Sequence, residues 1–310
     1  MKIIIDTDPG TDDAVAILIA LAHFSDEEIL GITTVAGNVG VNVGTTNALR
    51  ILEHAGRNNI NVYKGESTPL KRELLTAEWV HGTDGLGGVP FPQPSKTEEN
   101  LDAVSFLKQS ISSSDEKVTL CVLGPMTNIG KALIEKPEIS ENIEQIIFMG
   151  GSATGGNTTP AAEFNILVDP DAAEVVLHSG IKLVMMGLDV THQAISTSDR
   201  IQNISETKTK TSELLVGLMS KLANLEMVKK KFPDGTPVHD AFVTAYLVDS
   251  SLTKGNFVNV EVETSSELTL GQTVVDTNEI SGRDKNVHWM NIVDDNKLFA
   301  IITKTSSLLP

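Results

Sequence analysis

The feature that most constrains this chain is a set of four aspartates near its N-terminus: Asp6, Asp8, Asp12 and Asp13. The β-branched run Ile3–Ile5 precedes them, and Pro9–Gly10 interrupts them, which predicts a buried strand followed by a sharp turn. The segment Ala14–Ala22 is apolar on nearly every side and predicts a buried helix. The acids are therefore expected between the carboxyl end of a strand and the start of a helix, where α/β enzymes place their sites.

Two interpretations of this acidic turn differ in what they explain. Aspartates at a helix N-terminus often cap the first turn and complement the helix dipole, which would account for Asp12 or Asp13. Capping does not explain Asp6 and Asp8, which share one face of the strand end. Clustered carboxylates repel one another unless a proton or a cation offsets their charge. We therefore expect a metal-binding or catalytic role, with a hard divalent cation and oxygen ligands.

Composition excludes several classes of function. The net charge of −17 argues against a phosphate backbone or an anionic membrane surface as a partner. The single cysteine, Cys121, excludes an intramolecular disulfide framework and a cysteine-based zinc cluster, and its apolar neighbours predict a core position. We expect no signal peptide and no membrane span, and therefore a cytoplasmic protein. With 310 residues, 40% of them hydrophobic, the chain can bury a large core.

Strand-like and helix-like segments alternate through the first 190 residues. This order predicts an α/β fold with a mostly parallel, Rossmann-like sheet flanked by helices, and right-handed crossovers that bring the strand ends to one edge. A C-terminal helical region and a few antiparallel strands from residue 256 onward are expected to follow, all in one domain, 1–310. The predicted strands are 2–6, 28–36, 117–123, 145–149 and 182–186. The predicted helices are the one containing 14–22 and ending at about His23, 43–55, 101–111, 129–134, 170–178, 211–231 and one beginning at His239.

Polar residues recur where the predicted strands end. Each has a simpler explanation, because Asn and Gly form turns and Thr127 or Asp240 could cap a helix. Their shared location on one predicted edge is what indicates a site. The residues concerned are Asn38, Thr127, Asn157, Glu163, Asn165, His239 and Asp240, and the segment Met149-Gly150-Gly151 follows one of the same strands.

Chemical roles can be assigned to the residues at this edge. A cation such as Ca²⁺ would take Asp8, Asp13 and Asp240 as ligands, with a backbone carbonyl near Thr127, water and substrate hydroxyls. Asp12 could then serve as the base for a metal-bound water.

The remaining polar residues divide between a leaving group and a sugar. His239 adjoins Asp240 and could donate a proton to a leaving group. Mixed donors and acceptors suit a polyhydroxylated ring, and four side chains supply them. They are Asn38, Asn157, Glu163 and Asn165.

The sequence resembles the inosine–uridine-preferring nucleoside hydrolases, which are calcium-dependent N-ribohydrolases. The matching blocks keep the family's order and extend from residue 1 to about 275. They are Asp6–Ala14, Thr33–Asn38, His81–Gly82, Met126–Asn128, Met149–Gly151, Ala162–Asn165, Gly187–His192 and Val238–Asp240.

The resemblance implies a role for each matching position. The implied calcium ligands are Asp8, Asp13, Asp240 and the Thr127 carbonyl. Asp12 matches the base that activates water, and His239 the proposed acid for a purine leaving group. The implied substrate-binding residues are Asn38, His81, Met149, Asn157, Glu163 and Asn165, with His81 in a mobile loop over the base. Asp6 and His192 are expected to support the site. A ribonucleoside substrate, homodimer or homotetramer assembly, and base recognition by residues 76–88 and 222–232 are also implied.

Two alternatives remain open at this point. A magnesium-dependent phosphohydrolase could use Asp6-Thr7-Asp8 as a strand-end nucleophile pair, although the chain lacks an obvious partner set for phosphate. A non-catalytic nucleoside- or sugar-binding protein could use the same fold, although Asp12 and His239 are both present. The basic run Lys229–Lys231 is expected to be a solvated helix end that complements the helix dipole.

Overall fold

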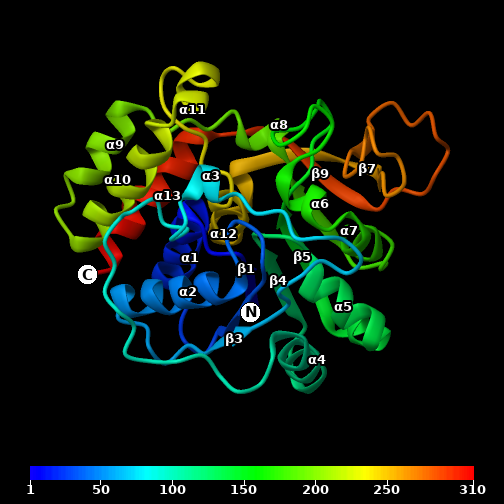
Figure 1. Ribbon diagram of the computed structural model, residues 1–310, viewed down its shortest axis with the longest axis horizontal. Coiled ribbons are helices and arrows are strands. Elements are labelled where there is room, and N and C mark those ends of the chain that lie inside the picture. Colours follow the sequence, from blue (N-terminus) through cyan, green and yellow to red (C-terminus); the bar gives the residue numbers. More distant parts are fainter.

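A nine-stranded sheet forms the centre of the computed structural model, which describes residues 1–310 (Figure 1). The strand order is β3-β2-β1-β4-β5-β6-β9-β7-β8. Strands β1 to β6 and β9 pair in parallel, whereas β7 is antiparallel to β9 and β8 is antiparallel to β7. The strands are β1 (Lys2–Thr7), β2 (Ile29–Thr34), β3 (Val62–Lys64), β4 (Val118–Val122), β5 (Ile143–Met149), β6 (Leu183–Met186), β7 (Thr253–Val262), β8 (Thr273–Asp276) and β9 (Val287–Val293).

Each face of the sheet packs against its own set of helices. In β1, Ile3 and Ile5 belong to one core and Ile4 to the other, because successive side chains point to opposite faces of a strand. The first core takes in α1 (Thr11–His23), α2 (Val41–Ala55), α10 (Lys210–Ala223), α12 (Ala241–Val248) and α13 (Asp295–Leu308). The second takes in α4 (Ala103–Ser113), α5 (Thr127–Glu135) and α7 (Pro170–Leu177).

Short helices complete the structure. They are α3 (Glu78–His81), α6 (Phe164–Val168), α8 (Leu188–Thr191), α9 (Ser198–Ser205), α11 (Glu226–Lys231) and the 3₁₀ turns η1 (Pro137–Asn142) and η2 (Ser250–Leu252). No helix combines the length and the apolar character needed to cross a bilayer.

The predicted α/β class and the alternating order are confirmed, and α1 is buried on nearly every side as expected. The expectation of antiparallel strands from residue 256 to the end is wrong in two places. Strand β9 is parallel to β6, and the chain closes with helix α13. The Ile301-Ile302-Thr303 stretch has β-branched residues typical of a strand, but Asp294 caps a helix by accepting from the Lys297 N–H, and Leu298 and Ile302 fill the core.

Two smaller differences affect the site. The single helix expected over 211–231 is two helices, α10 and α11, because Leu225 adopts an extended conformation between them. The helix expected from His239 begins at Ala241, which places Asp240 at its N-cap. Both differences occur beside the edge where the parallel strands end.

Candidate active site

One cavity opens near the carboxyl ends of the parallel strands, and it gathers most of the residues that the sequence singled out. These lining residues are Asp12, Asn38, His81, Met149, Asn157, Glu163, Asn165, His192, His239 and Asp240. Asp8, Asp13 and Thr127 are buried and do not line the cavity. Positions more than two hundred residues apart thus meet at one edge, as the parallel topology requires.

Three carboxylates lie together at one end of the cavity. An oxygen from each of Asp12, Asp13 and Asp240 lies within 4.8 Å of the other two. Burial raises the pKa of Asp12 to about 6, and burial together with the neighbouring acids raises the pKa of Asp240 well above its usual range. Asp240 occupies the N-cap of α12 without making a capping hydrogen bond, so capping does not explain it. The grouped oxygens suit a hard cation.

Asp8 lies outside this group of three but close enough for its charge to raise the pKa of Asp240. Its Oδ2 accepts a hydrogen bond from the Asn38 N–H at 2.6 Å, whereas its Oδ1 is buried without a partner. Gly37 and Gly124 cradle the carboxylate: a Cβ on Gly37 would lie 2.0 Å from Oδ2, and one on Gly124 2.3 Å from Oδ1. A buried carboxylate oxygen without a partner is costly, so Asp8 is suited to share a cation with the neighbouring acids.

The cradle gives a first prediction. The substitution Gly37→Ala is expected to lower Ca²⁺ affinity about tenfold or more, because the added methyl group displaces the Asp8 carboxylate. Gly40 in the same loop is the matched control, since a Cβ there meets nothing within 4 Å and its φ of −60° suits any residue. Calorimetric titration with Ca²⁺ measures both variants. Equal affinities for Gly37→Ala and Gly40→Ala would show that Asp8 plays no part in metal binding.

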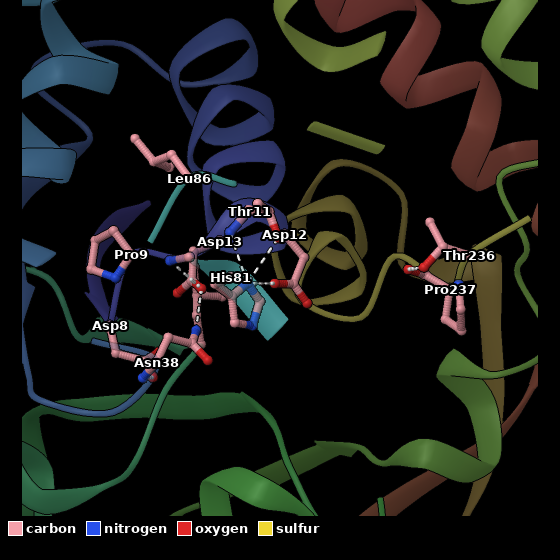
Figure 2. A network of polar contacts seen from close by, with 12 residues as sticks. Asp8, Pro9, Thr11, Asp12, Asp13, Asn38, His81, Leu86, Thr236 and Pro237 are labelled. Carbon is pink, nitrogen blue, oxygen red and sulfur yellow. Dashed lines mark hydrogen bonds and ion pairs between the residues drawn. The ribbon is translucent and has the colours of Figure 1, made fainter. Parts of the chain in front are cut away.

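Asp13 is fixed by hydrogen bonds on both of its oxygens. Oδ1 accepts from the Thr7 hydroxyl at 2.5 Å, and Oδ2 accepts from the Gly10 N–H at 2.9 Å. Oδ2 also accepts from the Asn38 side-chain amide at 3.0 Å (Figure 2). The bond to Gly10 is a capping contact for α1, so Asp13 also caps the helix. Asn38, expected to bind substrate, thus also holds the acidic residues Asp8 and Asp13 in place.

His81 packs against the N-terminus of α1 rather than standing free above the cavity. Its Nδ1 lies 3.2 Å from the Thr11 N and 2.8 Å from the Thr11 hydroxyl, and 4.0 Å from Asp12 Oδ1 (Figure 2). Because the Thr11 N–H donates to Nδ1, the ring is neutral with its proton on Nε2. Burial accordingly lowers the pKa of His81 to about 4. The expected loop position is therefore a one-turn helix, α3, anchored to α1.

Glu163 anchors the opposite wall of the cavity. Its Oε1 accepts from the Asn165 N–H at 2.9 Å, and its Oε2 accepts from the N–H groups of Gly151 at 3.0 Å and Ile166 at 3.2 Å. The carboxylate therefore caps α6 as well as lining the cavity. Burial raises its pKa to about 7.

Asn165 and Asn157 on this wall are also held by hydrogen bonds to the chain. The Asn165 amide donates to the carbonyl oxygens of Leu123 at 2.7 Å and Met149 at 3.1 Å. Asn157 Oδ1 accepts from the Phe164 N–H at 3.0 Å. Polar groups fixed in this way can present donors and acceptors to hydroxyl groups without reorganising.

His239 faces the cavity beside the acidic group. Its Nδ1 lies 2.8 Å from the Thr191 hydroxyl, and its ring centre lies 5.5 Å from that of His192 in an edge-to-face arrangement. Burial, with smaller contributions from the positive charges nearby, lowers the pKa of His239 to about 3. The imidazole is therefore neutral at physiological pH, and Nε2 is the nitrogen left for a ligand.

The sequence analysis did not single out the apolar side chains at the mouth of the cavity. Trp79 on α3 and Met227 on α11 line the cavity although they are 52% and 49% exposed. Phe232 packs against His192 with ring centres 5.0 Å apart. Only the expectation that residues 76–88 and 222–232 surround the base pointed to this region. Exposed aromatic and thioether groups at a cavity rim suit a planar ligand.

The basic run at the end of α11 is exposed in the last turn of the helix, as the sequence predicted, and one of its lysines also lines the cavity. Lys231 lines the cavity, whereas Lys229 and Lys230 do not. Its ammonium lies 5.4 Å from the Phe232 ring centre and forms no ion pair with an acid. One lysine of the three therefore adds positive charge to the histidine end of the cavity.

Lys231 gives a second prediction. Burial, with a smaller contribution from the Lys231 charge, lowers the pKa of His192 to about 4. Lys231→Met is expected to raise the His192 pKa, whereas Lys230→Met leaves it unchanged. Titration of the imidazole resonances by NMR measures both. A His192 pKa that responds equally to the two substitutions would contradict the placement of Lys231 in the cavity.

Two predicted residues lie behind the cavity wall. The Thr127 hydroxyl donates to Asp169 Oδ2 at 2.7 Å at the start of α5. Asp6 accepts from the Thr33 hydroxyl at 2.5 Å and the Asn128 amide at 2.8 Å, so it joins β1 to β2 and α5. Burial raises the Asp6 pKa to about 7.

Comparisons with known proteins agree with this geometry. The family model of the inosine-uridine preferring nucleoside hydrolases matches residues 3–300. The chain belongs to this family. A pyrimidine-specific ribonucleoside hydrolase, RihA, of Shewanella baltica is 43% identical over 288 residues, covering 92% of this chain and 89% of the relative. An uncharacterized protein of Schizosaccharomyces pombe is 42% identical over the full length of both chains.

A solved structure supports the same conclusion for the fold. The purine-preferring ribonucleoside hydrolase of Gardnerella vaginalis superimposes with a TM-score of 0.90 at 31% identity, covering 99% of each chain. The protein is thus a ribonucleoside hydrolase that cleaves the N-glycosidic bond of ribonucleosides. The two named enzymes act on different classes of base, so the family alone does not fix base preference.

Proposed function

We propose that this nucleoside hydrolase is calcium-dependent and releases ribose and a free base, with Asp12 as general base and His239 assisting the leaving group. The observation that carries the proposal is the convergence of three features in one cavity. These are the carboxylates of Asp12, Asp13 and Asp240, the polar wall formed by Glu163 and its neighbours, and the neutral imidazole of His239.

Asp8, Asp13 and Asp240 are the proposed calcium ligands, together with the Thr127 carbonyl. All are oxygen donors, as Ca²⁺ prefers, and the buried Asp8 Oδ1 lacks any other partner. When bound, the ion would coordinate ribose hydroxyls and lower the pKa of the attacking water. The mutual repulsion that raises the pKa of Asp240 also favours a divalent cation at this place.

Asp12 is the proposed base that accepts a proton from the attacking water. It lines the cavity, and it lacks the hydrogen bonds to Thr7, Gly10 and Asn38 that hold Asp13. Its pKa of about 6 leaves it ionised at neutral pH yet a better base than an ordinary aspartate. Asn38, Asn157, Glu163 and Asn165 are proposed to bind the ribose, with Met149 lining its pocket.

His239 is proposed to act on the base as a neutral imidazole. Its pKa of about 3 argues against an imidazolium that transfers a proton in the resting enzyme. In the tautomer whose Nδ1 accepts from the Thr191 hydroxyl, the Nε2–H can donate a hydrogen bond to a base nitrogen or oxygen as negative charge develops there. His81 also lines the cavity and carries its proton on Nε2, and it is proposed to contact the substrate through this N–H.

A panel of ribonucleosides, their 2′-deoxy forms and phosphoesters tests the proposal, each with Ca²⁺ and with a chelator. We expect free ribose in the presence of Ca²⁺ and much weaker hydrolysis of the deoxy substrates, because calcium is proposed to hold the 2′ hydroxyl. Release of inorganic phosphate would instead support the phosphohydrolase alternative. Tight nucleoside binding without turnover would support a binding protein.

A further inference from the structure

Asp189 on α8 is the centre of a hydrogen-bond cluster that none of the proposed chemical roles uses. Its Oδ1 accepts from the hydroxyls of Ser152 at 3.2 Å and Thr154 at 2.9 Å. Its Oδ2 accepts from the Ala153 N–H at 2.8 Å and the Trp289 indole N–H at 3.0 Å. One half-buried carboxylate thus joins three segments: the loop after β5, helix α8 and strand β9.

The loop after β5 leads directly to the polar wall of the cavity. Gly151, at its start, donates from its N–H to Glu163 and accepts from the Leu188 N–H at 2.9 Å through its carbonyl. The same loop carries Asn157, which lines the cavity. Asp189 therefore fixes the start of the loop that presents the proposed ribose-binding side chains.

Helix α8 leads to the histidine end of the cavity. Two residues after Asp189, the Thr191 hydroxyl contacts His239 Nδ1, and the next residue, His192, lines the cavity. Asp189 and Thr191 both belong to the single helical turn Leu188–Thr191, and His192 follows at its C-cap. The two walls of the cavity, which are separate in sequence, are thus both connected to one carboxylate.

We propose that Asp189 is a positioning residue. It fixes the ribose-binding loop relative to Thr191, which contacts His239, so that sugar and base are bound at the correct spacing. The inference rests on the proposed function for the identity of the ligand. It follows from four hydrogen bonds to one side chain, three of them from consecutive residues, 152–154. Misplacement of a substrate-binding wall by about 1 Å can cost on the order of 10²-fold in rate.

The substitutions Asp189→Ala and Asp189→Asn separate positioning from a general structural role. Alanine removes all four acceptor contacts, so we expect KM for ribonucleosides to rise about tenfold or more, with a weaker affinity for free ribose. Asparagine can keep the pattern, because its oxygen accepts from Ala153 and Trp289 while its NH₂ donates to the two hydroxyls. We therefore expect Asp189→Asn to retain a KM within about twofold of the wild type.

The control is Asp249→Ala, which removes an acid that accepts from Ser251 far from the cavity. KM does not depend on the folded fraction of the enzyme, so a merely destabilised protein changes melting temperature but not KM. If Asp189→Ala does not fold, Thr154→Val and Trp289→Phe each remove one donor and are expected to raise KM two- to threefold.

Two results would overturn the inference: a KM and ribose affinity unchanged in Asp189→Ala, Thr154→Val and Trp289→Phe, or an Asp189→Asn variant as impaired as Asp189→Ala. Ribose binding by calorimetry separates this inference from the proposed function. A wild-type protein that hydrolysed no nucleoside would refute the function, whereas ribose affinity lost in Asp189→Ala and kept in Asp189→Asn would still support positioning.

Discussion

Asp12→Asn is expected to lower kcat by about 10²–10⁴-fold, the usual contribution of general acid–base catalysis, while the protein still binds Ca²⁺. An amide cannot accept the proton that the attacking water must lose. The substitution conserves volume, and Asp12 makes no hydrogen bond that fixes the acidic turn, so the geometry of Asp13 and Asp240 is expected to persist. Steady-state kinetics at saturating nucleoside, paired with calorimetric Ca²⁺ titration, gives both quantities.

The matched control is Asp13→Asn, one position further along the same helix. Asp13 holds Thr7, Gly10 and Asn38, so its substitution is expected to weaken Ca²⁺ binding as well as activity. The distinction matters because the structure groups the Asp12 oxygens with those of Asp13 and Asp240. If Asp12→Asn also lost its calcium, Asp12 would be a metal ligand. A kcat close to that of the wild type would remove it as the base.

Much of the fold could be predicted because local patterns and the parallel topology agree. The run Ile3–Ile5 and the apolar segment after Pro9–Gly10 gave β1 and α1 with nearly correct bounds. The C-terminal helix α13 escaped prediction because Ile301-Ile302-Thr303 favours a strand locally, whereas packing of Leu298 and Ile302 against α1 and α12 decides the outcome. Tertiary burial overrode local propensity there.

The site residues that follow predicted strands could be predicted from the sequence. The contacts that depend on tertiary packing could not. Asp12, Glu163 and His239 meet in one cavity, as the strand-end rule and the family resemblance indicated. The neutral state of His239 could not be foreseen, because it results from burial among segments distant in sequence. The role of Gly37 could not be foreseen either, because its missing side chain leaves room for a carboxylate from another loop.

The metal-free protein is expected to lose stability as the pH rises from 6.5 to 8. Burial raises the pKa values of Asp6 and Glu163 to about 7. Burial and the neighbouring aspartates raise the pKa values of Asp8 and Asp240 well above their usual range. Between the unfolded value near 4 and the raised folded value, the folded state holds protons that the unfolded chain has released. This stabilisation is complete at low pH and is lost as the pH passes the folded pKa values.

Histidines oppose this trend in the lower part of this range. The pKa of His81 is lowered to about 4 and that of His239 to about 3, so near and below the unfolded value of about 6.5 the unfolded chain holds protons that the folded state does not. At about pH 7.5 and above, these side chains are neutral in both states and contribute no slope. The upper part of the range, toward pH 8, therefore reports the carboxylates.

Calcium is expected to remove most of this loss, because the ion takes the place of the protons that neutralise the acidic group. At a concentration of about 100 times Kd, ligand binding adds roughly 2.7 kcal/mol to the free energy of unfolding. This corresponds to a Tm increase of about 5 °C or more. The increase is expected to be larger at pH 8 than at pH 6.5. Thermal melts with Ca²⁺ and with a chelator at both pH values measure it. Asp240→Asn, which lowers the repulsion and removes a ligand, is expected to melt higher than the wild type without metal at pH 8 and to respond little to Ca²⁺. A calcium effect of the same size at both pH values would mean that the carboxylates are ionised throughout this range, and that burial does not raise their pKa values.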